Sequence, residues 1–387
     1  MRRKTDQQAL WNHPYFTLSF VNVLSNLGFS IVLTTMTTYT LSMGATLSLA
    51  GTIASLFSFA AMLVRPFGGY LFDRINKKTV YILSTMLMGL TVLGYSFAGS
   101  LPVLMVIRAV HGALFGVSTT AAMALVTHFI PRERTSEGLG YFNAGTLVGQ
   151  AVGPVIGSAL IASISFRTMY TLIALSMALP PLFFCLVRLP EDGTVQAPKE
   201  PFRLSRLIET RFLVFAIVGG LFSYYNGTTN SFVLSIGQER GIQNISLFFT
   251  VASVSLIVIR IVVGRAADRA SLKVMVLSSL CITMLSMLLF AQAWTLPMCL
   301  AAALLKSIGQ GMGHVTLQGE AMKRADAART GVVASTMLLG SDIGNTLGPT
   351  VSGIIAQHSG YAAVCYSGML LTGLIALLFY WHVRRNP

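Results

Sequence analysis

Long apolar stretches alternate with short polar ones along the whole chain. A helix needs about 20 mostly apolar residues to cross the hydrocarbon core of a bilayer. Twelve stretches reach this length, at residues 14–41, 45–72, 79–99, 101–129, 137–163, 168–189, 210–237, 242–267, 273–294, 296–322, 331–358 and 361–382. Several are longer than one perpendicular crossing needs, which indicates tilted or curved helices. The pattern predicts an all-α integral membrane protein with twelve transmembrane helices.

The longest polar segment lies between the sixth and the seventh stretch and contains several prolines and charged residues. Such a composition is typical of a linker. We therefore predict an N-terminal six-helix bundle at residues 1–189, a cytoplasmic linker at residues 190–209 and a C-terminal six-helix bundle at residues 210–387. Because no soluble catalytic domain is left, we expect no enzyme.

The two predicted bundles repeat one another at a constant spacing of 195 positions (260 − 65 = 195). Three blocks share this offset: Arg65, Gly69, Asp73 and Arg74 recur as Arg260, Gly264, Asp268 and Arg269, Arg134 and Thr135 recur as Arg329 and Thr330, and Gly145, Gly149, Gly153 and Pro154 recur as Gly340, Gly344, Gly348 and Pro349. Two copies of one membrane unit are typical of secondary transporters, which bind their substrate at the interface between the repeats.

The charge distribution fixes the expected topology. Only 10% of the residues are charged, against about 25% in a soluble domain, yet the net charge is +14. The basic residues gather at the termini and in every second connection, as the positive-inside rule requires if both termini are cytoplasmic. We therefore expect no nucleic-acid partner. The expected partner at this point is the lipid bilayer.

The cysteines and histidines indicate neither a metal nor a cofactor. The four cysteines, Cys185, Cys281, Cys299 and Cys365, lie in apolar stretches without metal or redox spacing, so we interpret them as small buried hydrophobic residues. The chain has no His-Glu-x-x-His zinc motif.

The turn after the second stretch is the most specific motif. Its residues Gly69, Leu71, Asp73, Arg74 and Lys78 match the loop Gly-x-Leu-Ala-Asp-Arg-x-Gly-Arg-Lys. At these positions the chain resembles the major facilitator superfamily, whose fold consists of two pseudo-symmetric six-helix bundles. The motif departs at Phe72, Asn76 and Lys77, and asparagine tolerates the left-handed turn that glycine would supply.

The resemblance implies a cytoplasmic gate in which Asp73 faces the start of the eleventh stretch near Gly331, and Asp268 faces the start of the fifth near Ser136. The gate residues would be Gly69, Asp73, Arg74, Lys78, Arg134, Asp268 and Arg269. Alternatively, these charges only set the topology.

Two further motifs concern direction and coupling. The fifth stretch contains Gly145, Gly149, Gly153, Pro154 and Gly157. It resembles the Gly-x-x-x-Gly-Pro-x-x-Gly motif of the drug:proton antiporter branch, which is associated with export. The alternative is ordinary small-residue packing. Arg108 resembles the arginine of the family's fourth span, which is linked to proton coupling, and an arginine within a span is usually functional. Its neighbour His111 titrates in the right pH range, or it serves packing.

Few other ionisable groups could carry a proton within the membrane. Asp342 lies near the middle of the eleventh stretch, and Lys306 lies at a similar depth in the tenth. Because a buried charge normally needs a partner, we expect these two to form a pair that proton or substrate binding breaks, or a static ion pair. Glu320 makes a gate or loop contact or carries the proton, and His314 is a further candidate.

In the family, spans one, four, seven and ten surround the central cavity. The resemblance therefore implies a cavity lined by Asn22, Asn26, Phe115, Phe222, Tyr224, Tyr225, Asn226 and Asn230. Each polar group among them could instead form an interhelical hydrogen bond.

The leading hypothesis is a proton-coupled antiporter that exports a small anionic, zwitterionic or amphiphilic organic compound by alternating access. The resemblance implies protons and a small-molecule substrate as partners and a bacterial inner membrane as the location, and we expect a monomer. Drug-transporting members of the family often have an acid in the first span. The first stretch here contains none, so the resemblance argues against a general pump for cationic drugs. Proton-coupled uptake of a sugar or organic acid is the alternative. A lipid flippase and a non-transporting membrane sensor are the hypotheses from other classes.

Overall fold

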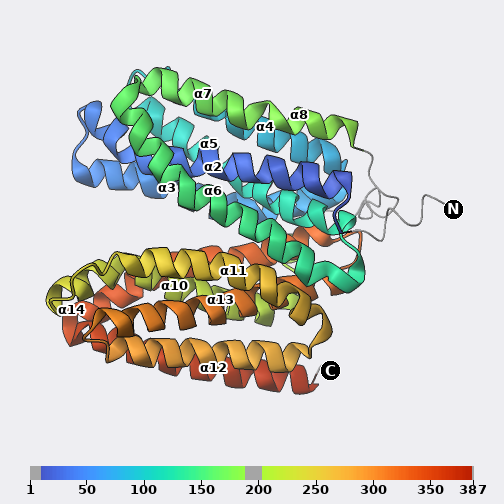
Figure 1. Ribbon diagram of the computed structural model, residues 1–387. Helices are drawn as coiled ribbons and strands as arrows, with labels where there is room; N and C mark the ends of the chain where they lie inside the picture. Colours follow the sequence, from blue (N-terminus) through green and yellow to red (C-terminus); the bar gives the residue numbers. More distant parts are fainter. Residues whose placement is uncertain (1–9, 188–202, 386–387) are drawn as a thin grey trace. The chain divides into compact units, whose positions relative to one another are not determined.

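The computed structural model describes residues 10–187 and 203–385, which are helical apart from short connections and contain no strand. The helices of the first half are α2 (His13–Ser42), α3 (Leu47–Arg74), α4 (Lys77–Tyr95), α5 (Leu101–Val126), α6 (Thr135–Ser163), α7 (Phe166–Ala178) and α8 (Pro180–Phe183) (Figure 1). Those of the second half are α10 (Leu213–Glu239), α11 (Leu247–Arg269), α12 (Leu272–Ala291), α13 (Leu296–Arg324) and α14 (Thr330–Arg385). Short 3₁₀ turns flank several of them. The all-α membrane fold is confirmed.

The predicted eleventh and twelfth spans are both part of α14. The helix changes direction at Gly360, which has φ 77° and ψ 171°. Only glycine adopts a positive φ without steric cost, so this residue separates the two spans. Nine helices of the described residues are long and apolar enough to cross a membrane, with α14 counted once. The helices α10 and α13 are not among these nine. They are long enough, but they contain many glycine and polar residues.

The predicted sixth span is interrupted. Its helix α7 ends at Ala178, and α8 begins at Pro180. Proline lacks the amide hydrogen that continues a helix, so the Pro180-Pro181 pair interrupts the hydrogen-bond pattern. Leu179 keeps helical dihedral angles (φ −78°, ψ −43°), and Phe166–Leu186 as a whole is still long and apolar enough to cross a membrane. Residues 188–202, which include most of the predicted linker, lie outside the described residues.

The chain forms two compact units. The first contains Met1–Arg132, Gly145–Ile208 and Ala325–Ser335, and the second contains Glu133–Ala144, Glu209–Arg324 and Thr336–Pro387. The start of α14 thus packs within the first unit, and the start of α6 packs within the second. The division into bundles at residues 189 and 210 stays a prediction.

The helix packing of the first unit recurs in the second at the spacing of the sequence repeat. In the first unit, α5 approaches α3 at Gly116, where a Cβ would lie 2.6 Å from the Ala61 carbonyl oxygen. In the second unit, α13 approaches α11 at Gly311, whose Cβ would lie 3.3 Å from Leu256. These partners are equivalent, since 61 + 195 = 256 and 116 + 195 = 311. The repeat is therefore a repeat of contacts as well as of residues.

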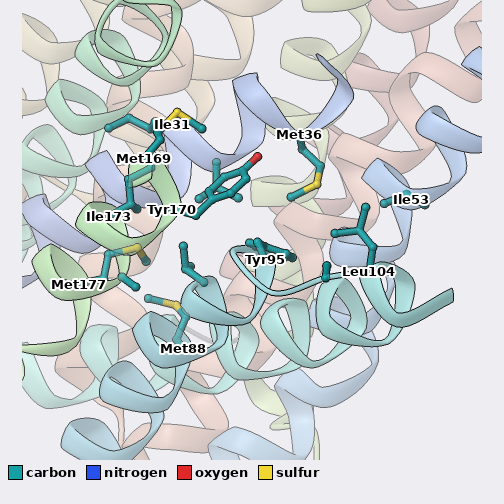
Figure 2. Close-up of a cluster of buried hydrophobic side chains, with 14 residues drawn as sticks. Ile31, Met36, Ile53, Met88, Tyr95, Leu104, Met169, Tyr170, Ile173 and Met177 are labelled. Atoms are coloured by element: carbon teal, nitrogen blue, oxygen red, sulfur yellow. The ribbon is translucent and has the colours of Figure 1, made fainter. Parts of the chain in front are cut away.

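The core of the first unit is apolar and rich in methionine. Ile31 and Met36 of α2, Met88 of α4, and Met169 and Met177 of α7 are at most 5% exposed (Figure 2). Since lipid chains are as apolar as these side chains, close packing rather than water exclusion joins helices in a bilayer.

The outer faces of the helices are apolar too. Leu83, Leu87 and Leu90 form an exposed stripe on α4, and Leu370 and Leu374 do so on α14. Such faces are covered by lipid in a membrane protein. Cys281 lies on an exposed face of α12, and Cys185 is exposed as well. Burial of the cysteines is confirmed for Cys299 and Cys365 and wrong for the other two, because apolarity alone does not separate lipid-facing from core positions.

Candidate functional site

Asp73 caps the start of α14. Its Oδ1 accepts a hydrogen bond from the amide of Gly331 at 2.7 Å, and its Oδ2 accepts one from Val332 at 2.9 Å. The carboxylate is only 2% exposed. The first amides of a helix have no partner within the helix and form its positive end, so a carboxylate there is stabilised. This is the contact expected from the signature loop, while the role of Asp73 in a gate stays a prediction.

Further residues hold the same segment. Lys77 Nζ donates to the Ala327 carbonyl at 2.7 Å and lies 3.4 Å from His128 Nε2, which lies 3.5 Å from Thr330 Oγ1. Gly69 faces Ser335, where a Cβ would lie 2.7 Å from Ser335 Oγ. Sequence reasoning missed Lys77 and His128. The motif pointed to Lys77 only as a departure, and no signal marked His128.

Asp268 caps the start of α6 in the same manner. Its two carboxylate oxygens accept hydrogen bonds from the amides of Ser136 and Glu137, both at 2.9 Å. The capped amides are equivalent to those that Asp73 binds, since 136 + 195 = 331 and 137 + 195 = 332. Each unit therefore contains one aspartate that caps one helix.

The second cap contains an ion-pair network centred on Glu137. Glu137 pairs with Arg134 Nε and with Arg265 Nε, both at 2.6 Å. Valine stands at the equivalent position 332, so the network has no counterpart there. Sequence reasoning identified Arg134 but not Glu137 or Arg265.

The other basic residues of the predicted gate lie beside the caps. Arg74 lies over the ring of Tyr70 at 4.4 Å. Lys78 donates to the carbonyls of Val187, at 2.8 Å, and Cys185. Arg269 is exposed at the end of α11.

Asn76 corrects the interpretation of the loop. Its φ is −58°, so it does not form the left-handed turn that we expected. Instead, Asn76 Oδ1 accepts a hydrogen bond from the Thr79 amide at 3.2 Å and caps α4. Asparagine is favoured here because it is among the best N-cap residues.

Arg108 and His111 form a buried basic cluster on α5. Both side chains are 0% exposed. The Arg108 guanidinium lies over the ring of Phe57 at 4.5 Å, and its nitrogens make no hydrogen bond within the described part of the chain. His111 Nδ1 lies 2.9 Å from the Tyr95 hydroxyl, which sequence reasoning missed. A buried guanidinium without a counter-charge is open to an anionic partner.

Lys306 has a different partner from the one expected. Its Nζ donates to Asn226 Oδ1 at 3.0 Å and lies 5.8 Å from the centre of the Phe248 ring. The expected pair of Lys306 with Asp342 is therefore wrong, and Asp342 is half-buried on α14. Residue spacing gave the depth of each side chain but not the direction in which it points around its helix.

The remaining proton candidates contact neighbours within the second unit. His314 Nε2 lies 3.4 Å from Ser223 Oγ, and its ring packs against Phe222. Glu320 pairs with Arg324 Nε at 2.5 Å, one turn further along α13. This ion pair lies within α13, so the gate or loop contact expected for Glu320 stays a prediction.

The predicted cavity residues make contacts within their own units. Asn22 Nδ2 donates to Thr146 Oγ1 at 2.8 Å, and Asn26 Nδ2 donates to Asn22 at 2.8 Å. A small pocket of the first unit is lined by these two, Phe115 and Ser25. The contact of Asn22 with Thr146 is the interhelical hydrogen bond that we weighed as the alternative.

The aromatic residues of α10 point into the second unit. The Tyr224 and Tyr225 hydroxyls lie 3.3 Å from Ser352 Oγ and 3.1 Å from Ser286 Oγ. Both rings line an apolar pocket of this unit. Asn230 is exposed. Lining of a central cavity stays a prediction for all of them.

The glycines of the fifth stretch face α2. A Cβ at Gly145 would lie 2.9 Å from Val23, one at Gly149 would lie 2.9 Å from the Leu27 amide, one at Gly153 would lie 2.5 Å from Ser30, and one at Gly157 would lie 3.2 Å from Thr35. In the second unit, Gly344 and Gly348 face the backbone of α10. Both copies therefore serve close helix packing, whatever else the motif does.

The comparisons with known proteins agree with this fold. The sequence model of the Major Facilitator Superfamily matches residues 18–344 and 216–387. The quinolone resistance protein NorA of Staphylococcus aureus is 28% identical over 156 residues, which is 40% of each chain, so the match spans less than half of this relative. The class H tetracycline resistance protein of Pasteurella multocida is 24% identical over 407 residues, which cover 97% of the chain and 98% of the relative.

Solved structures show the same fold. The human organic anion transporter MFSD10 superposes with a TM-score of 0.81 at 17% identity, covering 94% of the chain and 98% of the transporter. The Escherichia coli fucose:proton symporter FucP (N162A) superposes with a TM-score of 0.80 at 16% identity, covering 95% and 98%. At such identities the likeness concerns the fold alone.

Proposed function

The chain belongs to the major facilitator superfamily, and from this premise we propose that it is a proton-coupled antiporter that exports a small organic compound. Members of this superfamily are transporters, and the membrane helices of the described residues fit that role. Transport by alternating access requires a part of the protein that exists in two conformations. The binding of the proton and of the cargo must each shift the equilibrium between these conformations.

The observation that carries this proposal is the pair of aspartate caps. Asp73 and Asp268 hold equivalent amides at the starts of α14 and α6. Each cap consists of two hydrogen bonds, which can break and re-form without unfolding either helix. We infer that the two caps are the latches of the cytoplasmic gate, closed together in one state of the transport cycle and open in the other.

The direction of transport rests on the relatives. The two curated relatives described above are named for resistance to quinolones and tetracycline, and resistance through a transporter of this fold means removal of the drug. By analogy, export is the direction proposed for this chain. The glycine face of α6 adds little to the argument, since its copy in α14 packs in the same way.

The charge of the cargo is argued from the buried bases. Arg108 lies in the first unit and Lys306 in the second, and the contacts shown for them include no carboxylate among the described residues. The fixed charge of Arg108 disfavours a simple cationic drug and favours a cargo with at least one negative group, such as a zwitterionic, anionic or amphiphilic compound.

Transport in proteoliposomes tests the proposal. The purified protein is reconstituted with a pH-sensitive dye inside the vesicles, and tetracycline, a quinolone and pooled metabolites are added against an imposed pH gradient. Proton flux opposite to cargo flux is expected. Flux in the same direction would establish proton-coupled uptake instead, and cargo movement without proton flux would contradict coupling. Vesicles without protein are the control and measure the passive leak of protons and cargo.

A further inference from the structure

The described part of α13 contains a buried amine whose surroundings are neutral. The Lys306 side chain is 3% exposed, and its Nζ makes one hydrogen bond, to the amide oxygen of Asn226. The ring of Phe248 covers another side at 5.8 Å. An ammonium has three hydrogens to donate, so this cation has lost most of its hydration and gained only one neutral acceptor.

Among the residues that the structure describes, the contacts of Lys306 with neighbouring helices are with Asn226 and Phe248, and neither carries a charge. On α10, Tyr225 is the nearest titratable neighbour of Asn226, and its hydroxyl lies against Ser286 of α12. On α11, Ala252 accepts a hydrogen bond from Ser307, so this level of α11 contains no charge. The charged residues of these helices are Glu239 on α10, Arg260, Arg265, Asp268 and Arg269 on α11, and Lys273 on α12. Arg260 is eight positions from Ala252, roughly 12 Å along the helix.

Lys306 occupies a position that the repeat also fills with a titratable base. His111 is its equivalent in the first unit, since 111 + 195 = 306. The packing around the two positions corresponds as well. Gly112 faces the Phe57 carbonyl, and Ser307 Oγ donates to the Ala252 carbonyl at 2.8 Å, where 57 + 195 = 252. His111 adjoins the fixed charge of Arg108, whereas Lys306 has no such neighbour.

We propose that Lys306 is the proton-binding group through which this transporter couples protons to its cargo, and that Asn226 positions it; the inference rests on the proposed function. The proton adds to the lone pair of the Nζ amine to give the ammonium, and it leaves from the same atom on the other side of the membrane. The Asn226 amide oxygen accepts a hydrogen bond from the amine or from the ammonium, so it remains paired in both states. A membrane lysine without a counter-charge tolerates the neutral form, which lysines in water rarely adopt.

The sign of this charge restricts the cargo. Antiport requires that the proton and the cargo bind in alternation, and linkage makes that exclusion mutual. A protonated Lys306 repels a cationic amine and attracts an anion. The cargo group that faces Lys306 is therefore an amine, as in a zwitterion, because an anion there would bind together with the proton and be carried in the same direction.

Three variants test this assignment in tetracycline-loaded proteoliposomes. Lys306→Gln imitates the neutral amine, and Lys306→Arg imitates the permanently protonated amine. Lys273→Arg is the matched control on α12. Substrate-driven proton flux and tetracycline self-exchange are measured for each. Lys306→Gln is expected to lose proton flux while it retains exchange that no longer varies with pH. Lys306→Arg is expected to lose both, and Lys273→Arg neither. If the role of Lys306 were merely structural, Lys306→Gln would not retain more tetracycline exchange than Lys306→Arg.

A second measurement needs no cargo. Brief acetylation with acetic anhydride over a series of pH values modifies only neutral amines, and peptide mapping by mass spectrometry reports each lysine. The reactivity of Lys306 is expected to level off at a lower pH than that of Lys273. Parallel profiles for the two lysines would overturn the assignment, as would proton flux that survives in Lys306→Gln. Absence of cargo-driven proton flux in the unmodified protein would contradict the proposed function, while the acetylation profile still decides whether Lys306 exchanges a proton.

Discussion

At the scale of single residues, the two caps differ in their surroundings although the two aspartates bind equivalent backbone amides. Asp73 is 2% exposed, whereas Asp268 is half-buried. A hydrogen bond to a carboxylate is stronger where water does not compete for it. The first cap also has Lys77 beside it, and the second has the Glu137 network. The two latches are therefore expected to contribute unequally.

Replacement of Asp73 tests this inequality. Asp73→Ala leaves two amides at the start of α14 without their acceptor, and loss of an N-cap costs about 0.5–2 kcal/mol. We expect the melting temperature in detergent to fall and an added cysteine near Gly331 to label faster. Asp268→Ala, at the equivalent position, is expected to have the smaller effect because water can replace its carboxylate. Equal effects of the two substitutions would contradict the role that we assign to burial.

The ion pairs of Glu137 are expected to matter less than the caps. The Arg134 and Arg265 side chains are 37% and 63% exposed, so the two guanidinium groups are partly solvated, whereas the Glu137 side chain is 4% exposed and keeps one arginine if the other is replaced. Pairs with exposed partners contribute about 0–1 kcal/mol. Arg265→Gln should therefore leave the melting temperature nearly unchanged at high salt. A large loss that persists in high salt would show that the network is structural.

For the aspartate caps and for Lys306, sequence reasoning identified the charged residue more readily than the group that it contacts. Asp73 and Asp268 stand in a repeated motif, and their capped segments followed from resemblance. Asn226 was identified as a polar residue of the seventh stretch but not as the partner of Lys306. Composition reveals that a buried charge needs a neighbour, and only coordinates reveal which neighbour it has.

At the scale of helices, glycine spacing decides how closely two of them approach. A Cβ at Gly149 would lie 2.9 Å from the backbone amide of Leu27, which cannot move aside as a flexible side chain could. By contrast, a Cβ at Gly51 on α3 would meet no atom within 4 Å. The same residue type therefore has opposite roles at these two positions.

The pair of substitutions Gly149→Ala and Gly51→Ala tests this contrast. Forcing a methyl group into a packed interface typically costs about 1–3 kcal/mol, so Gly149→Ala should lower the melting temperature. Gly51→Ala replaces a poor helix former by a good one at an open position and should leave it unchanged or raise it slightly. Thermal unfolding, monitored by size-exclusion chromatography, measures the melting temperature of both variants. An unchanged melting temperature for Gly149→Ala would mean that α6 can move away from α2.

At the scale of the whole molecule, the basic residues predict the orientation in the membrane. The turn between α2 and α3 contains no basic residue, whereas the turn between α5 and α6 contains Arg132 and Arg134. The positive-inside rule places the first turn outside and the second in the cytoplasm. Both termini would then be cytoplasmic.

Cysteine labelling of intact cells checks this topology. Ser42, the last residue of α2, and Glu133, in the connection between α5 and α6, are exposed. In a variant without native cysteines, Ser42→Cys should react with a membrane-impermeant maleimide in intact cells, and Glu133→Cys should react only after permeabilisation. The reverse pattern would invert the topology and also the side on which the aspartate caps lie.

The sequence by itself determined the features that depend on local composition and on duplication. The twelve apolar stretches, the 195-residue repeat and the signature loop around Asp73 follow from residue type and spacing, because a bilayer imposes a minimum helix length and a charge bias on any chain that crosses it. The interruption at Pro180 and the bend at Gly360 were readable in principle from the same residues.

Tertiary structure alone decided which side chains meet. Spacing along a helix gives depth in the membrane, but the angle around the helix axis depends on packing against every neighbour at once. For this reason Lys306 donates to Asn226 rather than to Asp342, and Asn76 caps α4 rather than turning the chain. The unpartnered nitrogens of Arg108 and the neutral surroundings of Lys306 likewise emerge only when the helices are assembled.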